Sequence, residues 1–237
     1  MKKLLKISIL GAVMLTTVFS SCKKEDFVEE NIDPNVLYAV DPEDQFLSAT
    51  IGVEDDFEAY YDDYRRIMWW MQMSTDARGN RKNFTRDVSN FNQRYGKIFF
   101  GRVGPKLSDI PQLISEMPAE KQAEYAYEKA IAQIFKSYYA FYASDINGSI
   151  PYTEAFQARY GGTLEPKYDT QSELFATLDA ELKAAVTTLK TAQPVAQKSY
   201  GSRDQFFQGN VTKWIKTGNA ARLRIAMRMS KVDPGRM

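Results

Sequence analysis

The sequence has no histidine and a single cysteine among its 237 residues. Histidine is the usual general base near neutral pH and the commonest metal ligand, so its absence excludes Ser-His-Asp and Cys-His catalytic sites and histidine-rich zinc sites. The lone cysteine, Cys22, has no partner for a disulfide within the chain. We therefore expect no enzyme activity, no catalytic residue, no metal and no cofactor.

The chain also lacks a strong charge bias, because 31 basic residues face 30 acidic ones. There is no long lysine- or arginine-rich patch interleaved with aromatic residues, so we expect no nucleic-acid partner. Apolar material is abundant: 44% of the residues are hydrophobic, including 14 Tyr and 14 Phe. This is enough to build a substantial core in one or two domains.

The N-terminus has the layout of a secretory signal peptide. Lys2, Lys3 and Lys6 precede an uncharged apolar run over residues 7–19, and small residues follow at Ser20 and Ser21. The run is shorter than the roughly 20 residues that a transmembrane helix needs. Residues 1–21 are predicted to be this signal peptide, and removing its three lysines leaves 28 basic and 30 acidic residues, a net charge of −2.

The two serines before Cys22 resemble the lipobox of bacterial lipoproteins, although Phe19 stands where leucine is common. In such proteins the cysteine becomes the first residue and is acylated, so Cys22 is the predicted lipidation site. An ordinary signal peptide followed by an incidental cysteine remains the alternative. After Cys22 comes KKEDFVEENIDPN, which is too polar to form a core, so residues 22–40 are predicted to be a flexible tether. The KKED stretch is similar to the export signal of surface-exposed lipoproteins in Bacteroidota.

Helical patterns dominate the rest of the chain. Asp-Pro-Glu at 41–43 predicts a helix start, and apolar residues recur at helical spacing over 57–71, before a polar loop at 74–83. Residues 91–117 look helical, with a break near Val103 imposed by Gly104-Pro105. The clearest helix covers 119–144, and a long ordered loop follows at 145–169.

Two more helices complete the prediction. Thr170 and Glu173 form a capping box ahead of a leucine-rich stripe, and the last helix spans about 210–230. No stretch alternates convincingly between apolar and polar residues. The predicted fold is therefore all-α, with antiparallel helix pairs and long ordered loops.

Four stretches together resemble the SusD/RagB family of nutrient-binding outer-membrane lipoproteins: NIDPNVLY, DINGSIPYTEAF, YDTQSELFATLDAEL and GNVTKWIKTGNAARLRIAMRMSKVDP. The resemblance implies a tetratricopeptide-like scaffold that caps a TonB-dependent transporter of the SusC type. It also implies capture of a glycan or another nutrient at the outer membrane and its delivery to the transporter, without catalysis. Members are substantially longer, so residues 41–237 are expected to be the N-terminal half of the domain, with the C-terminal half missing.

The candidate ligand-binding residues lie in and after the early helix. Trp69 and Trp70 point away from the predicted apolar face of that helix, either toward a second helix layer or outward as a platform for sugar rings or a surface for the transporter. The following loop supplies polar donors suited to sugar hydroxyls, Arg78, Asn80, Arg81 and Asn83. Ordinary loop polarity would look the same.

Three other features have structural explanations. The adjacent acidic pairs at 55–56 and 62–63 diverge on a helix and do not suit glycoside hydrolysis. The basic residues of the last helix are expected to neutralise acidic neighbours. Pro151 and Tyr152 are expected to dock their loop onto the helices. The function that we expect is glycan capture at the cell surface; the alternative is a helical scaffold that contacts the transporter without a ligand site of its own.

Overall fold

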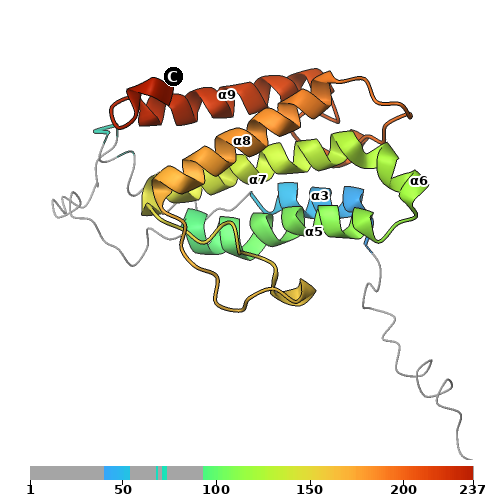
Figure 1. Ribbon diagram of the computed structural model, residues 1–237, viewed down its shortest axis with the longest axis horizontal. Coiled ribbons are helices and arrows are strands. Elements are labelled where there is room, and N and C mark those ends of the chain that lie inside the picture. Colours follow the sequence, from blue (N-terminus) through green and yellow to red (C-terminus); the bar gives the residue numbers. More distant parts are fainter. Residues whose placement is uncertain (1–39, 54–67, 69–70, 74–92, 237) are drawn as a thin grey trace, which may run out of the picture. The chain divides into compact units, whose positions relative to one another are not determined.

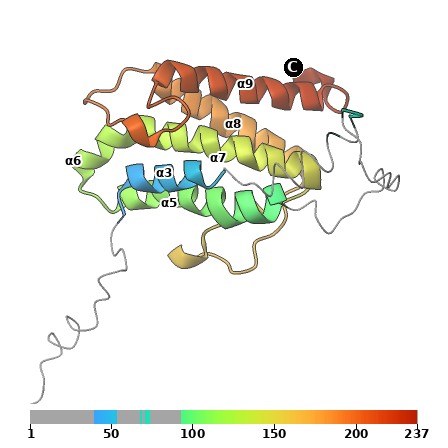
Figure 2. The same ribbon diagram turned by 180° about the vertical axis from the view of Figure 1, so that it is seen from behind.

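The computed structural model describes residues 40–53, 68, 71–73 and 93–236. Within these ranges the chain is helical, without β-strands, and the compact unit runs from Val40 to the C-terminus. The long helices run alternately in opposite directions (Figures 1 and 2): α5 (Gly104–Ser115), α7 (Ala126–Asn147), α8 (Gln171–Lys190) and α9 (Val211–Met229). They stack as tetratricopeptide-like antiparallel pairs, which confirms the predicted fold class. No helix in the described part is both long and apolar enough to cross a membrane.

The first described helix, α3 (Pro42–Ile51), begins where Asp41-Pro42-Glu43 predicted. Asp41 occupies the N-cap position, but its side chain accepts no capping hydrogen bond. Phe46 is the buried anchor of α3, and its ring stacks on Tyr200 with centroids 3.8 Å apart. The short helix is therefore held by aromatic packing against a segment more than 150 residues away.

A π-helix, η4 (Gln93–Val103), leads directly into α5 (Gly104–Ser115). The hydrogen-bonding pattern changes at Gly104-Pro105, as the sequence predicted, because Pro105 lacks a backbone donor. The π geometry itself was not predicted. Gly104 is required here, since a Cβ atom at this position would overlap the ring of Phe156.

The prediction of a single helix over 119–144 was wrong for the first part of this range. The range consists of α6 (Ala119–Gln122), the 3-10 turn η5 (Ala123–Tyr125) and α7 (Ala126–Asn147). The cause is the amide of Gln197: its Nε2 donates to the carbonyl of Ala123, and its Oε1 accepts from the amide of Tyr127. These two backbone groups would bond each other in a continuous α-helix. The inserted side chain replaces that bond and interrupts the helix.

The C-terminal helices match their predictions. In α8 (Gln171–Lys190), Thr170 and Glu173 form the capping box, and the predicted stripe is buried: Leu174, Leu178, Leu182, Val186 and Leu189. In α9 (Val211–Met229), Asn210 caps the N-terminus and Trp214, Gly218, Ala221 and Ile225 are buried. Gly218 permits close approach, since a Cβ there would lie 2.6 Å from Val186 on α8. Short turns η6 (Ala158–Tyr160), η7 (Gly201–Arg203) and η8 (Pro234–Arg236) complete the described elements.

Candidate functional site

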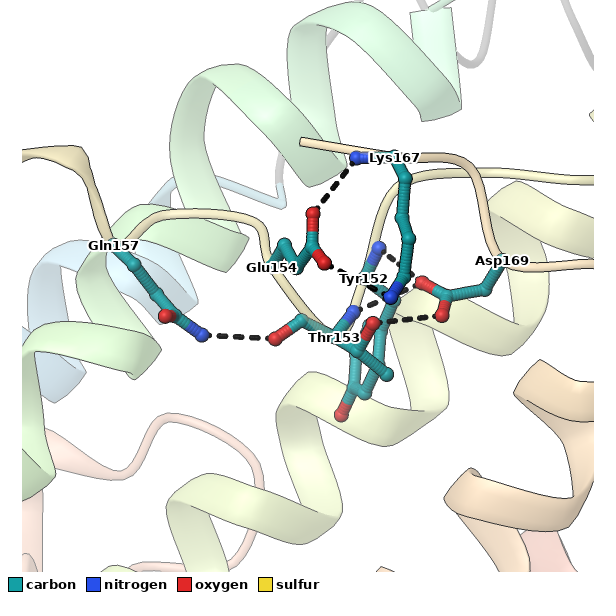
Figure 3. A network of polar contacts seen from close by, with 6 residues as sticks. All are labelled: Tyr152, Thr153, Glu154, Gln157, Lys167 and Asp169. Atoms are coloured by element: carbon teal, nitrogen blue, oxygen red, sulfur yellow. Dashed lines mark hydrogen bonds and ion pairs between the residues drawn. The ribbon is translucent and has the colours of Figure 1, made fainter. Parts of the chain in front are cut away.

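The loop between α7 and α8 is anchored at its base by one carboxylate. Oδ2 of Asp169 accepts from the amides of Tyr152 and Thr153 at 2.8 and 2.9 Å, and Oδ1 accepts from the Thr153 hydroxyl at 2.7 Å (Figure 3). Burial alone would raise the pKa of Asp169, but these hydrogen bonds favour the ionised form and the net pKa lies below its usual value. The carboxylate therefore fixes the loop as long as it remains ionised.

Tyr152 connects the base of this loop to the helices. Pro151 and Tyr152 are both buried, in agreement with the prediction that they dock the loop onto the helices. Its hydroxyl donates to Oε2 of Glu181 on α8 at 2.5 Å. The amide of Gln133 on α7 donates to the same oxygen at 2.7 Å and also lies 3.1 Å from the Tyr152 hydroxyl. Helix α7, helix α8 and the loop thus meet at one hydrogen-bonded cluster.

A polar cavity of about 530 Å³ opens beside this cluster. Helix α5 contributes Ser108 and Gln112, and helix α7 contributes Lys129, Gln133 and Lys136. The remaining wall comes from α8 and the loop, with Tyr152, Phe156, Tyr160 and Glu181 among its residues. The volume lies within the range of about 300–1,000 Å³ that is usual for small-molecule sites. Aromatic rings beside amide, hydroxyl and ammonium groups suit a ligand with both apolar faces and many hydroxyls.

Phe156 connects this wall to the core. It has a left-handed backbone conformation with φ of 64°, which is costly for a bulky residue. Its ring lies over Gly104 and makes an edge contact with Phe99, with centroids 5.7 Å apart. Packing at Gly104 therefore helps to hold the strained backbone, and the cavity wall is set by the fold.

A second, apolar cavity of about 280 Å³ lies on the α7–α9 side. It is lined by Phe135, Tyr138, Tyr139, Phe206, Phe207, Trp214 and Thr217. Most of these rings are packed edge-on against one another, as Phe207 is against Trp214. This cavity offers ring faces with few polar groups, so it suits hydroxyl-rich ligands less well than the polar cavity.

In the described ranges no group of three or more Cys, Asp or Glu side chains is placed to hold a metal ion. Glu181, the carboxylate of the polar cavity, is already the acceptor for Tyr152 and Gln133. The arrangement supports binding by hydrogen bonds and ring contacts.

Comparison with protein families identifies the chain. A SusD-like family, described as "Starch-binding associating with outer membrane", matches residues 37–237. The chain belongs to this SusD-like family. Comparison with curated protein sequences finds no match.

Solved structures agree with the SusD-like fold. A chitin-binding protein superposes with a TM-score of 0.67 at 23% identity, covering 83% of this chain and 40% of its own. A SusD homologue from Parabacteroides distasonis gives 0.63 at 22% identity, with coverages of 82% and 36%. A chitin-binding SusD homologue from Flavobacterium johnsoniae gives 0.58 at 22%, with coverages of 82% and 40%. The chain thus spans 40% or less of the length of these solved structures.

The site residues predicted from the sequence lie outside the described ranges. These are the lipidation site Cys22 and the candidate ligand contacts Trp69, Trp70, Arg78, Asn80, Arg81 and Asn83. Of the early helix, only Met68 is described as helical. The acidic pairs at 55–56 and 62–63 also fall outside.

The polar cavity was missed, although one signal for it is visible in the sequence. The otherwise apolar helix α7 has a polar stripe, formed at helical spacing by Lys129, Gln133 and Lys136. The basic residues of α9 behave partly as expected: Arg222 pairs with Asp179 and Arg228 with Asp145. Arg224 instead lies over the ring of Tyr142, 5.3 Å from its centroid.

Proposed function

We propose that this SusD-like protein binds an extracellular glycan at the bacterial surface and delivers it to a TonB-dependent outer-membrane transporter of the SusC type, without catalysis. Acylated Cys22 would hold it in the outer membrane, and residues 22–40 would be the tether. The observation that carries the proposal is the family match over residues 37–237, with its description of starch binding and outer-membrane association. The names of two structural neighbours, both chitin-binding, support a glycan ligand.

The polar cavity supports the same class of ligand, because its amide and hydroxyl groups stand beside aromatic rings. Trp69 and Trp70 are the proposed platform for sugar rings, and Arg78, Asn80, Arg81 and Asn83 the proposed donors to sugar hydroxyls. Such pairing of aromatic faces with planar donors matches a pyranose, which has apolar faces and a hydroxyl-bearing rim.

Isothermal titration of the purified chain with maltooligosaccharides and chitooligosaccharides tests this function. Trp69→Ala and Trp70→Ala should each weaken the affinity at least about tenfold, equivalent to about 1.4 kcal/mol. Tyr168→Ala removes an aromatic side chain that is 63% exposed on the loop, and this control should bind like the wild type. Failure of the wild-type chain to bind any glycan would leave the scaffold as the better explanation.

A helical scaffold that touches the transporter without its own ligand is the second candidate. It is favoured by Leu223 and Met227, which lie one turn apart on α9 and are 62% and 64% exposed. Neighbouring exposed apolar side chains are typical of a surface that contacts another protein. Under this candidate, Leu223→Ser with Met227→Ser should abolish co-purification with the transporter, while glycan titrations of the wild type stay flat.

A further inference from the structure

We propose that the polar cavity binds a negatively charged sugar unit, a uronic acid or a sulfated sugar, through the ammonium groups of Lys129 and Lys136. This inference rests on the proposed glycan-binding function and specifies the ligand class. It starts from the two cations that line the cavity on helix α7.

Neither lysine has a direct ion-pair partner within the described part of the chain. Lys129 and Lys136 form no ion pair there and donate no hydrogen bond to a described residue. Nζ of Lys136 instead lies over the Tyr152 ring, 4.9 Å from its centroid. Burial lowers the pKa of Lys136, opposed by the negative charge of Glu181, so the ammonium has lost part of its hydration. A partly desolvated cation without an acceptor is ready to receive an anionic one.

The charge balance of the cavity points to an anion. Its lining side chains carry two ammonium groups and one carboxylate, Glu181. Oε2 of that carboxylate already accepts from Tyr152 and Gln133, which reduces its capacity to serve the lysines. One negative charge on a ligand would balance the remaining positive charge.

The other groups of the cavity favour a sugar over a simple inorganic anion. Ser108 also lines the cavity; its Oγ is buried and has no hydrogen-bond partner within the described part of the chain. The amide of Gln112 also lines the cavity, and the ring of Phe156 provides an apolar wall. A ligand that contacts the Gln112 amide and the Phe156 ring needs hydroxyl groups and an apolar face in addition to its charge, and a charged pyranose has these.

Titration of the purified full chain with four probes tests the assignment. The probes are an oligogalacturonide trimer, a sulfated disaccharide, maltotriose and inorganic sulfate. At least one charged sugar should bind tenfold or more tightly than maltotriose and inorganic sulfate, and its affinity should fall as salt is raised. Binding of the oligogalacturonide would identify a carboxylate as the recognised anion, and binding of the sulfated disaccharide would identify a sulfate.

Variants assign the binding to the two lysines. Lys136→Met and Lys129→Gln should each weaken binding of the charged sugar about 10- to 100-fold, which corresponds to one charge-assisted hydrogen bond. Lys136→Arg should retain most of the affinity, and Lys183→Met, which removes an exposed lysine of α8 outside the cavity, should leave it unchanged. Lys136→Met should unfold at or above the wild-type temperature, because it removes a partly buried charge that has no direct ion pair in the described part of the chain. A loss of binding in this variant would therefore not be due to a loss of folding.

Binding of maltotriose as tight as that of the charged sugars would overturn the anionic assignment and leave the glycan-binding function intact. Charged-sugar binding that survives both lysine substitutions would also overturn it. Absence of binding to every sugar probe would overturn the proposed function together with this inference.

Discussion

Nε1 of Trp214 on α9 donates a hydrogen bond to Oδ2 of Asp204 at 2.7 Å, and both side chains are buried. Asp204 accepts three more hydrogen bonds, from the amides of Phe206 and Phe207 at Oδ1 and of Gly209 at Oδ2. A fully buried carboxylate is tolerated because four donors replace its hydration. The turn before α9 is therefore organised around one acidic side chain.

Asp204→Asn should destabilise the protein although it changes one atom. The amide nitrogen would have to replace one carboxylate oxygen, and each oxygen already faces two donors. We expect a loss of about 2–4 kcal/mol in the free energy of unfolding, from unpaired buried donors. Urea denaturation measures it; Asp179→Asn, at a partly exposed ion pair with Arg222, is the control and should cost less than about 1 kcal/mol. Equal losses in the two variants would contradict this account.

Gln197→Met should loosen the junction between η5 and α7. Methionine has a similar length, but it can neither donate to the Ala123 carbonyl nor accept from the Tyr127 amide. We expect a loss of about 1–3 kcal/mol and faster hydrogen exchange at the Tyr127 amide. Gln193→Met is the matched control, since the hydrogen bonds that Gln193 donates within the described part of the chain go to carbonyls at the end of α8. Unchanged exchange at Tyr127 would mean that the backbone breaks there for another reason.

Because Glu128 is buried, we expect the stability of the protein to fall as pH rises toward 8. The Glu128 carboxyl is fully buried, and neither oxygen accepts a hydrogen bond from the described part of the chain. Burial, followed by the charge of Glu43, raises the pKa of Glu128 to about 8. Lys198 and Arg203 oppose this shift. Because the folded pKa exceeds the unfolded value, the folded state binds more protons between about pH 4.5 and 8. The contribution of Glu128 to stability is thus complete below this window and falls as pH rises through it, by at most about 1.4 kcal/mol per pH unit.

Glu128→Gln removes the titration and should flatten the profile measured by denaturation from pH 5 to 8. At pH 8 the variant should be more stable than the wild type, because the neutral amide avoids a buried negative charge. Glu120→Gln, an exposed change on α6, should preserve the wild-type slope. Parallel profiles for the wild type and Glu128→Gln would show that another group controls the dependence.

Cys22→Ala should release the protein from the membrane fraction. The acyl chains of a lipoprotein supply the anchoring free energy, roughly 0.8 kcal/mol per buried methylene, and alanine has no acceptor for them. Cell fractionation and labelling with an alkyne fatty acid provide the two measurements. Ser20→Ala keeps a small residue before the cysteine and should remain membrane-bound. Membrane association of Cys22→Ala would exclude lipidation as the anchor.

Features that depend on neighbours in sequence were predicted well. The Thr170–Glu173 capping box and the leucine stripe of α8 need only helical periodicity, and both are present. The interruption at Ala123 was not predictable, because its cause, Gln197, is 74 residues away and is recognised only when the fold brings it there. The same holds for the polar cavity, since the spacing of Lys129 and Lys136 is visible but the position of Glu181 is not. Asp204 lies in a turn with no periodic pattern to indicate its burial.

The long loop between α7 and α8 has a base that is fixed to the fold and a tip that is exposed. The Ile150–Asp169 bridge and the bonds of Asp169 close its base, while Leu164 near its tip is 86% exposed. Because the Leu164 side chain is exposed, a peptide inserted after Leu164 would lengthen a loop whose ends are already joined, at small entropic cost. The helical stack can thus serve as a display scaffold, carrying foreign epitopes at this point while its helices stay in register.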